Sequence, residues 1–111
     1  MKKLNVQFVA TAAAIAIVLF FSAPARAENA SGTLYKAKCA ACHGPDGSGS
    51  AVGTKLGAHD FHSPAVQTQS DAALTGIIAS GKGKMPSYQK TLKAEEITGL
   101  VAYIRSLAPA K

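Results

Sequence analysis

The stretch Cys39-Ala40-Ala41-Cys42-His43 contains both cysteines of the chain, three residues apart, and a histidine follows them at once. Residues at positions i, i+3 and i+4 share one face of a helix, so Cys39, Cys42 and His43 are expected to face the same object. Two thiols at this spacing can add to the vinyl groups on one porphyrin edge, and the adjacent imidazole then reaches the iron. The stretch therefore predicts one haem c, covalently bound through thioethers at Cys39 and Cys42, with His43 as the proximal iron ligand.

Two other interpretations of the cysteine pair fit the sequence less well. A redox dithiol usually lies at the start of a helix that follows a strand, and no strand–helix–strand pattern is found here. A zinc site needs four ligands, commonly with a second Cys or His pair, whereas this chain has two cysteines in all. The motif alone does not say what the haem is for, because that depends on the other face of the iron.

The N-terminal segment has the pattern of a secretory signal peptide. Two lysines precede the nearly unbroken apolar run 8–21, and residues 23–27 offer small side chains in an A-x-A arrangement. An apolar run of this length is shorter than the roughly 18–20 residues needed to span a membrane, which argues against an uncleaved anchor. The sequence predicts a signal peptide over residues 1–27, with cleavage after Ala27 or, alternatively, after Ala25.

The rest of the chain, residues 28–111, is predicted to be one small periplasmic domain with no membrane span. Removal of the leader lowers the formal net charge from +6 to +3, with nine Lys and Arg against six Asp and Glu. This balance does not predict nucleic-acid binding, for which a strongly basic domain is typical. A core of this size supplies only a few kcal/mol, so a buried porphyrin is expected to complete it. Thioether bonds would also keep the cysteines from pairing in an oxidising compartment.

Helical patterns predict an all-α fold in which three to four short helices wrap one haem, with long loops and no significant sheet. Ser31 can cap a first helix that runs to about Ala41, and the glycine-rich stretch after the motif must end it. Loop sequence is expected up to about Gln69, because the chain there packs against a flat cofactor instead of pairing with itself. Leu56 and Phe61 are expected to face inward.

Two further helices follow this loop. One is predicted from about Asp71 to Ser80, with Ser70 as its N-cap and Gly81 at its C-terminal end. The other is predicted from about Ala94 to Leu107 and has the clearest apolar face of the chain, with two acidic residues in its first turn.

Met85 is the candidate for the second iron ligand. It precedes Pro86 in a glycine-rich loop, and it is the only methionine outside the leader. A lone methionine is usually core filler, but that role suits a helical stripe better than a loop rich in Gly, Lys and Pro. His/Met ligation raises the reduction potential of a haem relative to bis-histidine ligation. His59 and His62 are rival ligands, and each is also compatible with an ordinary surface histidine.

These features together resemble the small class I c-type cytochromes of bacteria, over essentially all of residues 28–111. The matching residues are Tyr35, the Cys-x-x-Cys-His-Gly motif at 39–44, Gly47-Ser48-Gly49, Met85-Pro86 and Leu100-Val101-Ala102-Tyr103. The resemblance implies a cytochrome c fold whose first and last helices cross near a right angle, with Tyr35 packing near Leu100 and Tyr103. It also implies that His43 and Met85 lie on opposite faces of the iron.

Two positions differ from the pattern of this family. In many members a proline carbonyl shortly before the position of Leu56 accepts a hydrogen bond from the proximal imidazole, whereas this chain has Thr54 and Lys55 there. The resemblance therefore does not identify the carbonyl that orients His43. Many members also have Ser or Thr before the last helix, where this chain has Lys93, which predicts a weaker cap.

With both axial positions of the iron filled, the chemistry that remains is one-electron transfer between Fe(II) and Fe(III). The sequence therefore predicts a soluble, monomeric electron carrier without catalytic residues, which docks onto a redox protein such as an oxidase, reductase or dehydrogenase. Lys82 and Lys84, together with Lys90 and Lys93, surround the methionine loop and favour an acidic partner. Simple solubility explains these lysines nearly as well.

Two alternative functions fit the same sequence. The first is a haem-based sensor or enzyme with a labile sixth ligand, although the attachment motif of cytochrome c′-like gas binders lies near the C-terminus of a four-helix bundle. The second is a dedicated cytochrome subunit of a dehydrogenase or oxidase complex, which the sequence does not distinguish from a free shuttle.

Overall fold

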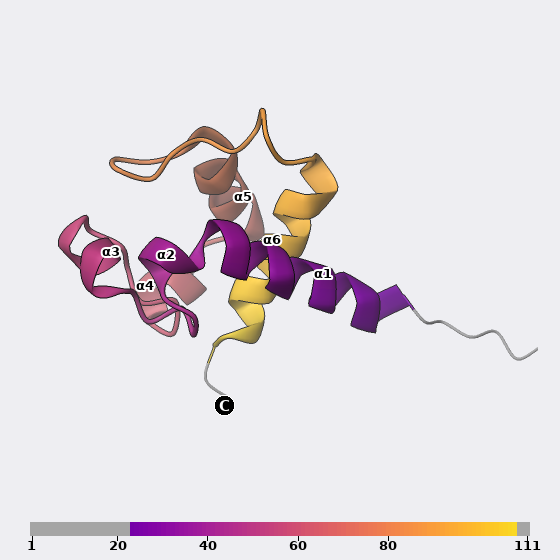
Figure 1. Cartoon of the computed structure of the whole chain (residues 1–111), viewed down its shortest axis with the longest axis horizontal. Helices are drawn as coiled ribbons and strands as arrows, with labels where there is room; N and C mark the ends of the chain where they lie inside the picture. The colour runs from indigo at the N-terminus through magenta and orange to yellow at the C-terminus, as the bar shows by residue number, and fades with distance from the viewer. Residues whose placement is uncertain (1–22, 109–111) are drawn as a thin grey trace, which may run out of the picture.

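The computed structural model describes residues 23–108, which form an all-α domain as predicted (Figure 1). Its helices are α1 Ala23–Lys38, α2 Ala40–His43, α3 Ala51–Lys55, α4 Pro64–Gln67, α5 Asp71–Ser80 and α6 Ala94–Ser106. Three of them are long, and α2, α3 and α4 are a single turn or little more. Within this part of the chain, the β-pairing is limited to an isolated bridge between Lys82 and Met85.

The predicted signal peptide lies mostly outside the described residues. Its apolar run 8–21 is not described, while residues 23–27 form the first part of α1. The cleavage site and the domain boundary stay predictions. Between residues 23 and 108, no helix is both long enough and apolar enough to cross a membrane.

The first helix differs from the prediction at both ends. It begins at Ala23, so Ser31 lies inside the helix instead of capping it, because the alanine-rich sequence upstream also favours a helix. Helical hydrogen bonds then continue past the end of α1 into α2: the Cys39 amide donates to the Tyr35 carbonyl at 2.8 Å, and the His43 amide donates to the Cys39 carbonyl at 2.9 Å. The whole cysteine–histidine motif therefore lies on helical backbone.

The segment expected to be a loop up to Gln69 contains two short helices that the prediction missed. Ser50 caps α3, since its hydroxyl accepts a hydrogen bond from the Gly53 amide at 2.9 Å. Ser63 precedes α4, whose first residue is Pro64, a favoured helix start. Helices of four or five residues are too short to show a periodic apolar pattern, so the sequence offers little sign of them.

The later helices agree with the prediction to within one residue. The Ser70 hydroxyl accepts a hydrogen bond from the Ala73 amide at 3.0 Å and caps α5, and Gly81 follows its last residue with a φ of 78°. At the start of α6, the Glu96 carboxylate accepts a hydrogen bond from the Lys93 amide at 3.0 Å. This interaction is one half of a capping box, and it offsets the missing hydroxyl cap at Lys93.

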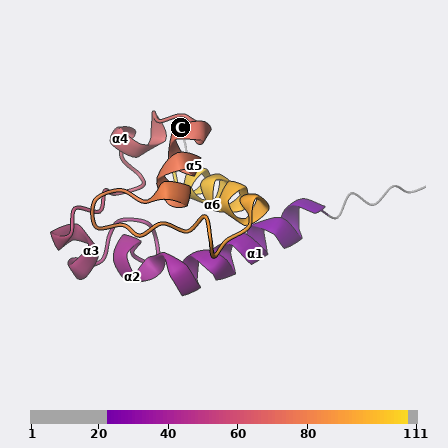
Figure 2. The ribbon, with the colours of Figure 1, turned by 90° about the horizontal axis from the view of Figure 1, so that it is seen from above.

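The hydrophobic core forms where α6 crosses α1 and packs against α5 (Figures 1 and 2). Tyr35 and Leu100 are each 1% exposed, and the Tyr35 ring centroid lies 4.9 Å from that of Tyr103, so the packing implied by the resemblance is confirmed. The two helices approach closely at Gly99, where a Cβ would lie 2.5 Å from the Ser31 hydroxyl oxygen. The buried apolar residues are Tyr35, Phe61, Val66, Leu74, Ile78, Leu92, Ile97, Leu100, Val101 and Ile104.

Replacement of Leu100 by alanine is expected to lower the free energy of unfolding by about 2–5 kcal/mol, because it leaves a cavity in the centre of this core. Val52→Ala is the matched control: Val52 is 62% exposed, so its truncation should change stability by less than about 0.5 kcal/mol. Denaturant unfolding of the haem-loaded protein measures both values. Equal effects of the two substitutions would contradict the assignment of the core.

Candidate functional site

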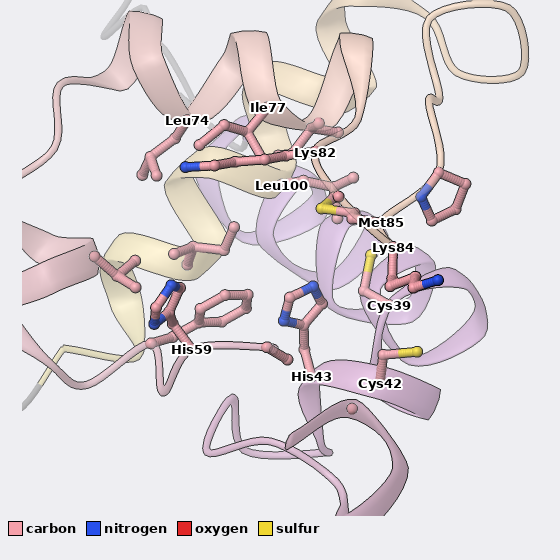
Figure 3. Close-up of a pocket in the computed structure, with 18 of the residues that line it drawn as sticks. Cys39, Cys42, His43, His59, Leu74, Ile77, Lys82, Lys84, Met85 and Leu100 are labelled. Carbon is pink, nitrogen blue, oxygen red and sulfur yellow. The ribbon is translucent and has the colours of Figure 1, made fainter. Parts of the chain in front are cut away.

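The four residues singled out by the sequence, Cys39, Cys42, His43 and Met85, all line one cavity of about 350 Å³. Figure 3 shows the His43 imidazole and the Met85 side chain facing each other from opposite sides of this cavity, with both cysteine sulfurs toward one edge. Leu74, Ile78, Leu100 and other apolar residues form much of the remaining wall. Residues distant in the sequence are thus brought together around one mainly apolar space.

The backbone of α2 is held against α3 by an unusually close contact. A Cβ on Gly53 would lie 1.7 Å from the Cys42 carbonyl oxygen, so only glycine fits at this position. The carbonyls at the end of α2 are bonded to Ser50, whose hydroxyl donates to the Ala41 carbonyl at 2.7 Å and whose amide donates to the Cys42 carbonyl at 3.0 Å. The short helix α3, which the sequence did not reveal, therefore fixes the position of the motif.

Burial affects the titratable groups of the motif. Neither cysteine forms a disulfide, and burial raises the pKa of the Cys39 thiol to about 11. Burial also lowers the pKa of His43, which favours the neutral imidazole, the form that binds a metal ion. The Tyr35 hydroxyl donates a hydrogen bond to the Gly44 carbonyl at 2.7 Å, which fixes the backbone just after His43.

The loop that carries Met85 is a tight turn anchored to α5 and α1. Met85 and Lys82 exchange two backbone hydrogen bonds, at 2.9 and 3.1 Å. The Tyr88 amide donates to the Ile78 carbonyl at 3.1 Å, and its hydroxyl donates to the Lys38 carbonyl at 3.2 Å. Tyr88 therefore ties the methionine loop to the end of α1, next to the motif. Sequence reasoning did not single out this residue.

The two rival histidines lie in different environments. His59 lines the cavity, on the side of His43 and across from Met85 (Figure 3). His62 is not among the lining residues, and its Nδ1 lies 2.6 Å from a carboxylate oxygen of Asp60. His59 therefore does not face His43 across the cavity, and His62 does not line it. Of the two residues expected to face inward, Phe61 is buried, whereas Leu56 lines the cavity but is 48% exposed.

The charge around the cavity is positive. Lys38, Lys82 and Lys84 line it, and none of the described residues that line it is acidic. Such a rim suits a ligand that carries carboxylates, as the propionates of a haem do. Two thiols that could bind a porphyrin covalently, with a neutral imidazole and a thioether that could bind its iron, also fit haem c. The described residues contain no group of three or more His, Cys, Asp or Glu that would hold a metal ion alone.

Comparison with known proteins identifies the family of the chain. Residues 27–104 match the family described as cytochrome c oxidase, cbb3-type, subunit III. The chain belongs to this family. It is 37% identical over 82 residues to the cbb3-type cytochrome c oxidase subunit CcoP of Azospirillum brasilense, a match that covers 71% of this chain and 28% of that protein. The chain thus spans little more than a quarter of that relative.

Solved structures of c-type cytochromes show the same fold. The KustC0563 c-type cytochrome matches with a TM-score of 0.68 and 31% identity, over 71% of this chain and 98% of that one. A tyrosine-to-phenylalanine mutant of the same cytochrome matches with a TM-score of 0.65 and 30% identity, over 69% of this chain and 96% of the mutant chain. The chain is therefore a c-type cytochrome with the cytochrome c fold, haem c is its cofactor, and electron transfer is its general role.

The contact between α3 and the motif leads to a test with two glycines. Gly53→Ala places a methyl group on the Cys42 carbonyl, so it should reduce the fraction of protein that incorporates haem and destabilise what remains. Gly76→Ala is the control: its Cβ meets nothing within 4 Å in α5, and it should stabilise the protein by about 0.5–1 kcal/mol. Haem content per protein and denaturant unfolding report both effects. Equal haem content in the two variants would argue against a role for α3.

Proposed function

We propose that this protein is a soluble periplasmic one-electron carrier. Cys39 and Cys42 hold the haem through thioether bonds, His43 is the proximal axial ligand of the iron, and Met85 is the distal one. Support comes from the shared cavity that the four side chains line, in which His43 and Met85 approach from opposite sides. Membership of a cytochrome family agrees with this assignment.

When bound, haem c supplies a one-electron couple between Fe(II) and Fe(III). The chain's own residues bind it, orient it and shield it. Met85 and His43 would hold the iron through a thioether and a neutral imidazole, and no iron site would then be open to a substrate. The apolar walls would limit the access of water to the haem, and burial together with His/Met ligation would favour a high reduction potential. Tyr88 would hold the methionine loop in place through its hydrogen bond to the Lys38 carbonyl.

Substitution of Met85 by alanine tests the ligand assignment. Loss of the thioether should convert a six-coordinate low-spin haem to a high-spin one, lower the reduction potential and allow the reduced protein to bind carbon monoxide. A redox titration followed by optical spectra measures all three properties.

The controls for this test are His59→Ala and His62→Ala, which should keep the low-spin spectrum of the wild type. If either histidine variant became high-spin while Met85→Ala stayed low-spin, Met85 would not be the ligand. Rapid binding of carbon monoxide by the reduced wild type would favour a sensor or enzyme with a labile sixth ligand.

Partner docking is proposed to use the lysines of the methionine loop. Lys82 and Lys84 are exposed and border the cavity, and Lys90 and Lys93 are exposed further along the same loop. Charges of one sign beside the redox centre raise the rate of encounter with an acidic partner, while the interface itself stays small and weak.

Charge reversal at Lys84 tests this docking surface. Lys84→Glu should slow electron transfer to the natural redox partner several-fold at low ionic strength, roughly as expected for lost electrostatic steering, and the difference should shrink as salt is added. Lys36→Glu changes the net charge equally, but Lys36 does not line the cavity, so its effect should be small. If both variants reacted equally fast at low salt, the loop lysines would serve solubility alone.

A second candidate function is that of an electron-delivering domain within an oxidase complex. The observation that favours it is the 37% identity to a subunit of a cbb3-type oxidase. Fractionation of cells that express the protein at its natural level separates the two candidates. Recovery in the periplasmic fraction, apart from oxidase subunits, supports the free carrier, whereas stable co-purification with membrane-bound oxidase supports the subunit.

A further inference from the structure

Among the described residues, the imidazole of His43 finds no partner for the hydrogen bond that commonly orients a proximal histidine. Its Nδ1 is buried, and within residues 23–108 it has no hydrogen-bond partner. The segment just before Leu56, where relatives were expected to supply a carbonyl, is helix α3 in this chain. The carbonyls of Gly53 and Thr54 there accept hydrogen bonds from the amides of Ala58 and Gly57, at 2.9 and 3.1 Å. They are therefore engaged within their own turn.

An aromatic ring contacts the imidazole instead. Phe61 stacks on His43 with ring centroids 4.5 Å apart and an angle of 26° between the ring planes. This geometry is close to parallel, and it restrains rotation of the imidazole about its side-chain bonds, because rotation would drive one ring into the other. A stacked ring thus fixes the plane of the histidine without needing an acceptor for Nδ1.

Phe61 is itself held firmly by its backbone. Its amide donates to the Gly47 carbonyl at 2.8 Å, and its carbonyl accepts a hydrogen bond from Gln67 Nε2 at 2.6 Å. The same Gln67 nitrogen also donates to the Ile104 carbonyl in α6, at 3.1 Å. The backbone of Phe61 is therefore tied to the loop after the motif on one side and to the last helix on the other.

The ring of Phe61 is confined as well. It is only 8% exposed, and it meets Tyr35 edge-on with centroids 6.3 Å apart. A Cβ on Gly47 would lie 3.0 Å from the Phe61 ring and 2.9 Å from Leu107, so the loop backbone packs directly against the ring. A side chain with so little freedom is suited to position another one.

We infer that Phe61 is the positioning residue for the axial imidazole: it fixes the plane of His43 by stacking, in place of a hydrogen bond to Nδ1. This inference rests on the proposed role of His43 as an iron ligand. The inference has an electronic consequence. A hydrogen-bond acceptor on Nδ1 makes a ligating imidazole a stronger electron donor to the metal. None of the described residues supplies such an acceptor to Nδ1 of His43. The ferric state is then stabilised less, which favours a higher reduction potential.

The test uses the ferric, haem-loaded protein and proton NMR. The order and spread of the four haem methyl resonances depend on the orientation of the axial imidazole plane. Phe61→Leu removes the aromatic face but keeps an apolar side chain, so it should change this pattern and shift the ring resonances of His43. Phe61→Tyr keeps the aromatic ring, so this variant should show the wild-type pattern of haem methyl resonances. If Phe61→Leu fails to incorporate haem, Phe61→Ile provides a second apolar, non-aromatic side chain with the volume of leucine.

A control separates positioning from loss of stability. Leu92→Ala truncates a residue that is also 8% exposed but does not line the cavity, so it should destabilise the fold and leave the methyl pattern unchanged. An unchanged pattern in Phe61→Leu, with His43 bound to the iron, would overturn the inference and leave the proposed function intact. Absence of iron-shifted His43 resonances in the wild type would overturn both.

Discussion

The position of Tyr35 links the hydrophobic core of this cytochrome to its functional site. Its ring is 1% exposed and fills the crossing of α1 and α6, where it contacts Tyr103 and Phe61. Its hydroxyl donates to the Gly44 carbonyl, directly after the histidine of the motif. Burial raises the pKa of this phenol, so it stays a donor at any ordinary pH. Because loss of a buried hydrogen bond costs about 1–3 kcal/mol, docking of α6 on α1 also selects the backbone conformation that presents His43 to the cavity.

A second set of contacts brings the distal segment to the same place. The loop from Gly81 to Tyr88 returns to α5 and α1 through hydrogen bonds to the carbonyls of Ile78 and Lys38, and a Cβ at Gly81 would lie 2.7 Å from the Met85 carbonyl. Met85 is therefore carried by a turn with little room to move. The two proposed axial ligands sit on separate segments, and each segment is attached to α1 by a tyrosine hydroxyl.

Local chemistry explains what could be predicted from the sequence. The thiol and imidazole spacing, the isolated Met85 and the caps and apolar faces of α5 and α6 are all encoded by neighbouring residues. The contact of Gly53 with Cys42 and the stacking of Phe61 on His43 join residues more than ten positions apart, and no periodic pattern marks either pair. The start of α1 was missed for a different reason: Ser31 suits a cap and also an ordinary helical position, and the sequence does not rank the two.

The inferred support of His43 by a stacked ring follows from the same local preferences. With Thr54 and Lys55 in this segment the chain forms α3, and the carbonyls of Gly53 and Thr54 accept hydrogen bonds from amides of their own turn. Helix α3 also brings Gly53 against the Cys42 carbonyl, where the motif ends. Support for the histidine must then come from another segment, and Phe61 is the residue that lies against it. Helix α3 and the stacked phenylalanine are thus two parts of one arrangement: the helix uses its own carbonyls, and the ring of Phe61 packs on the imidazole of His43 instead.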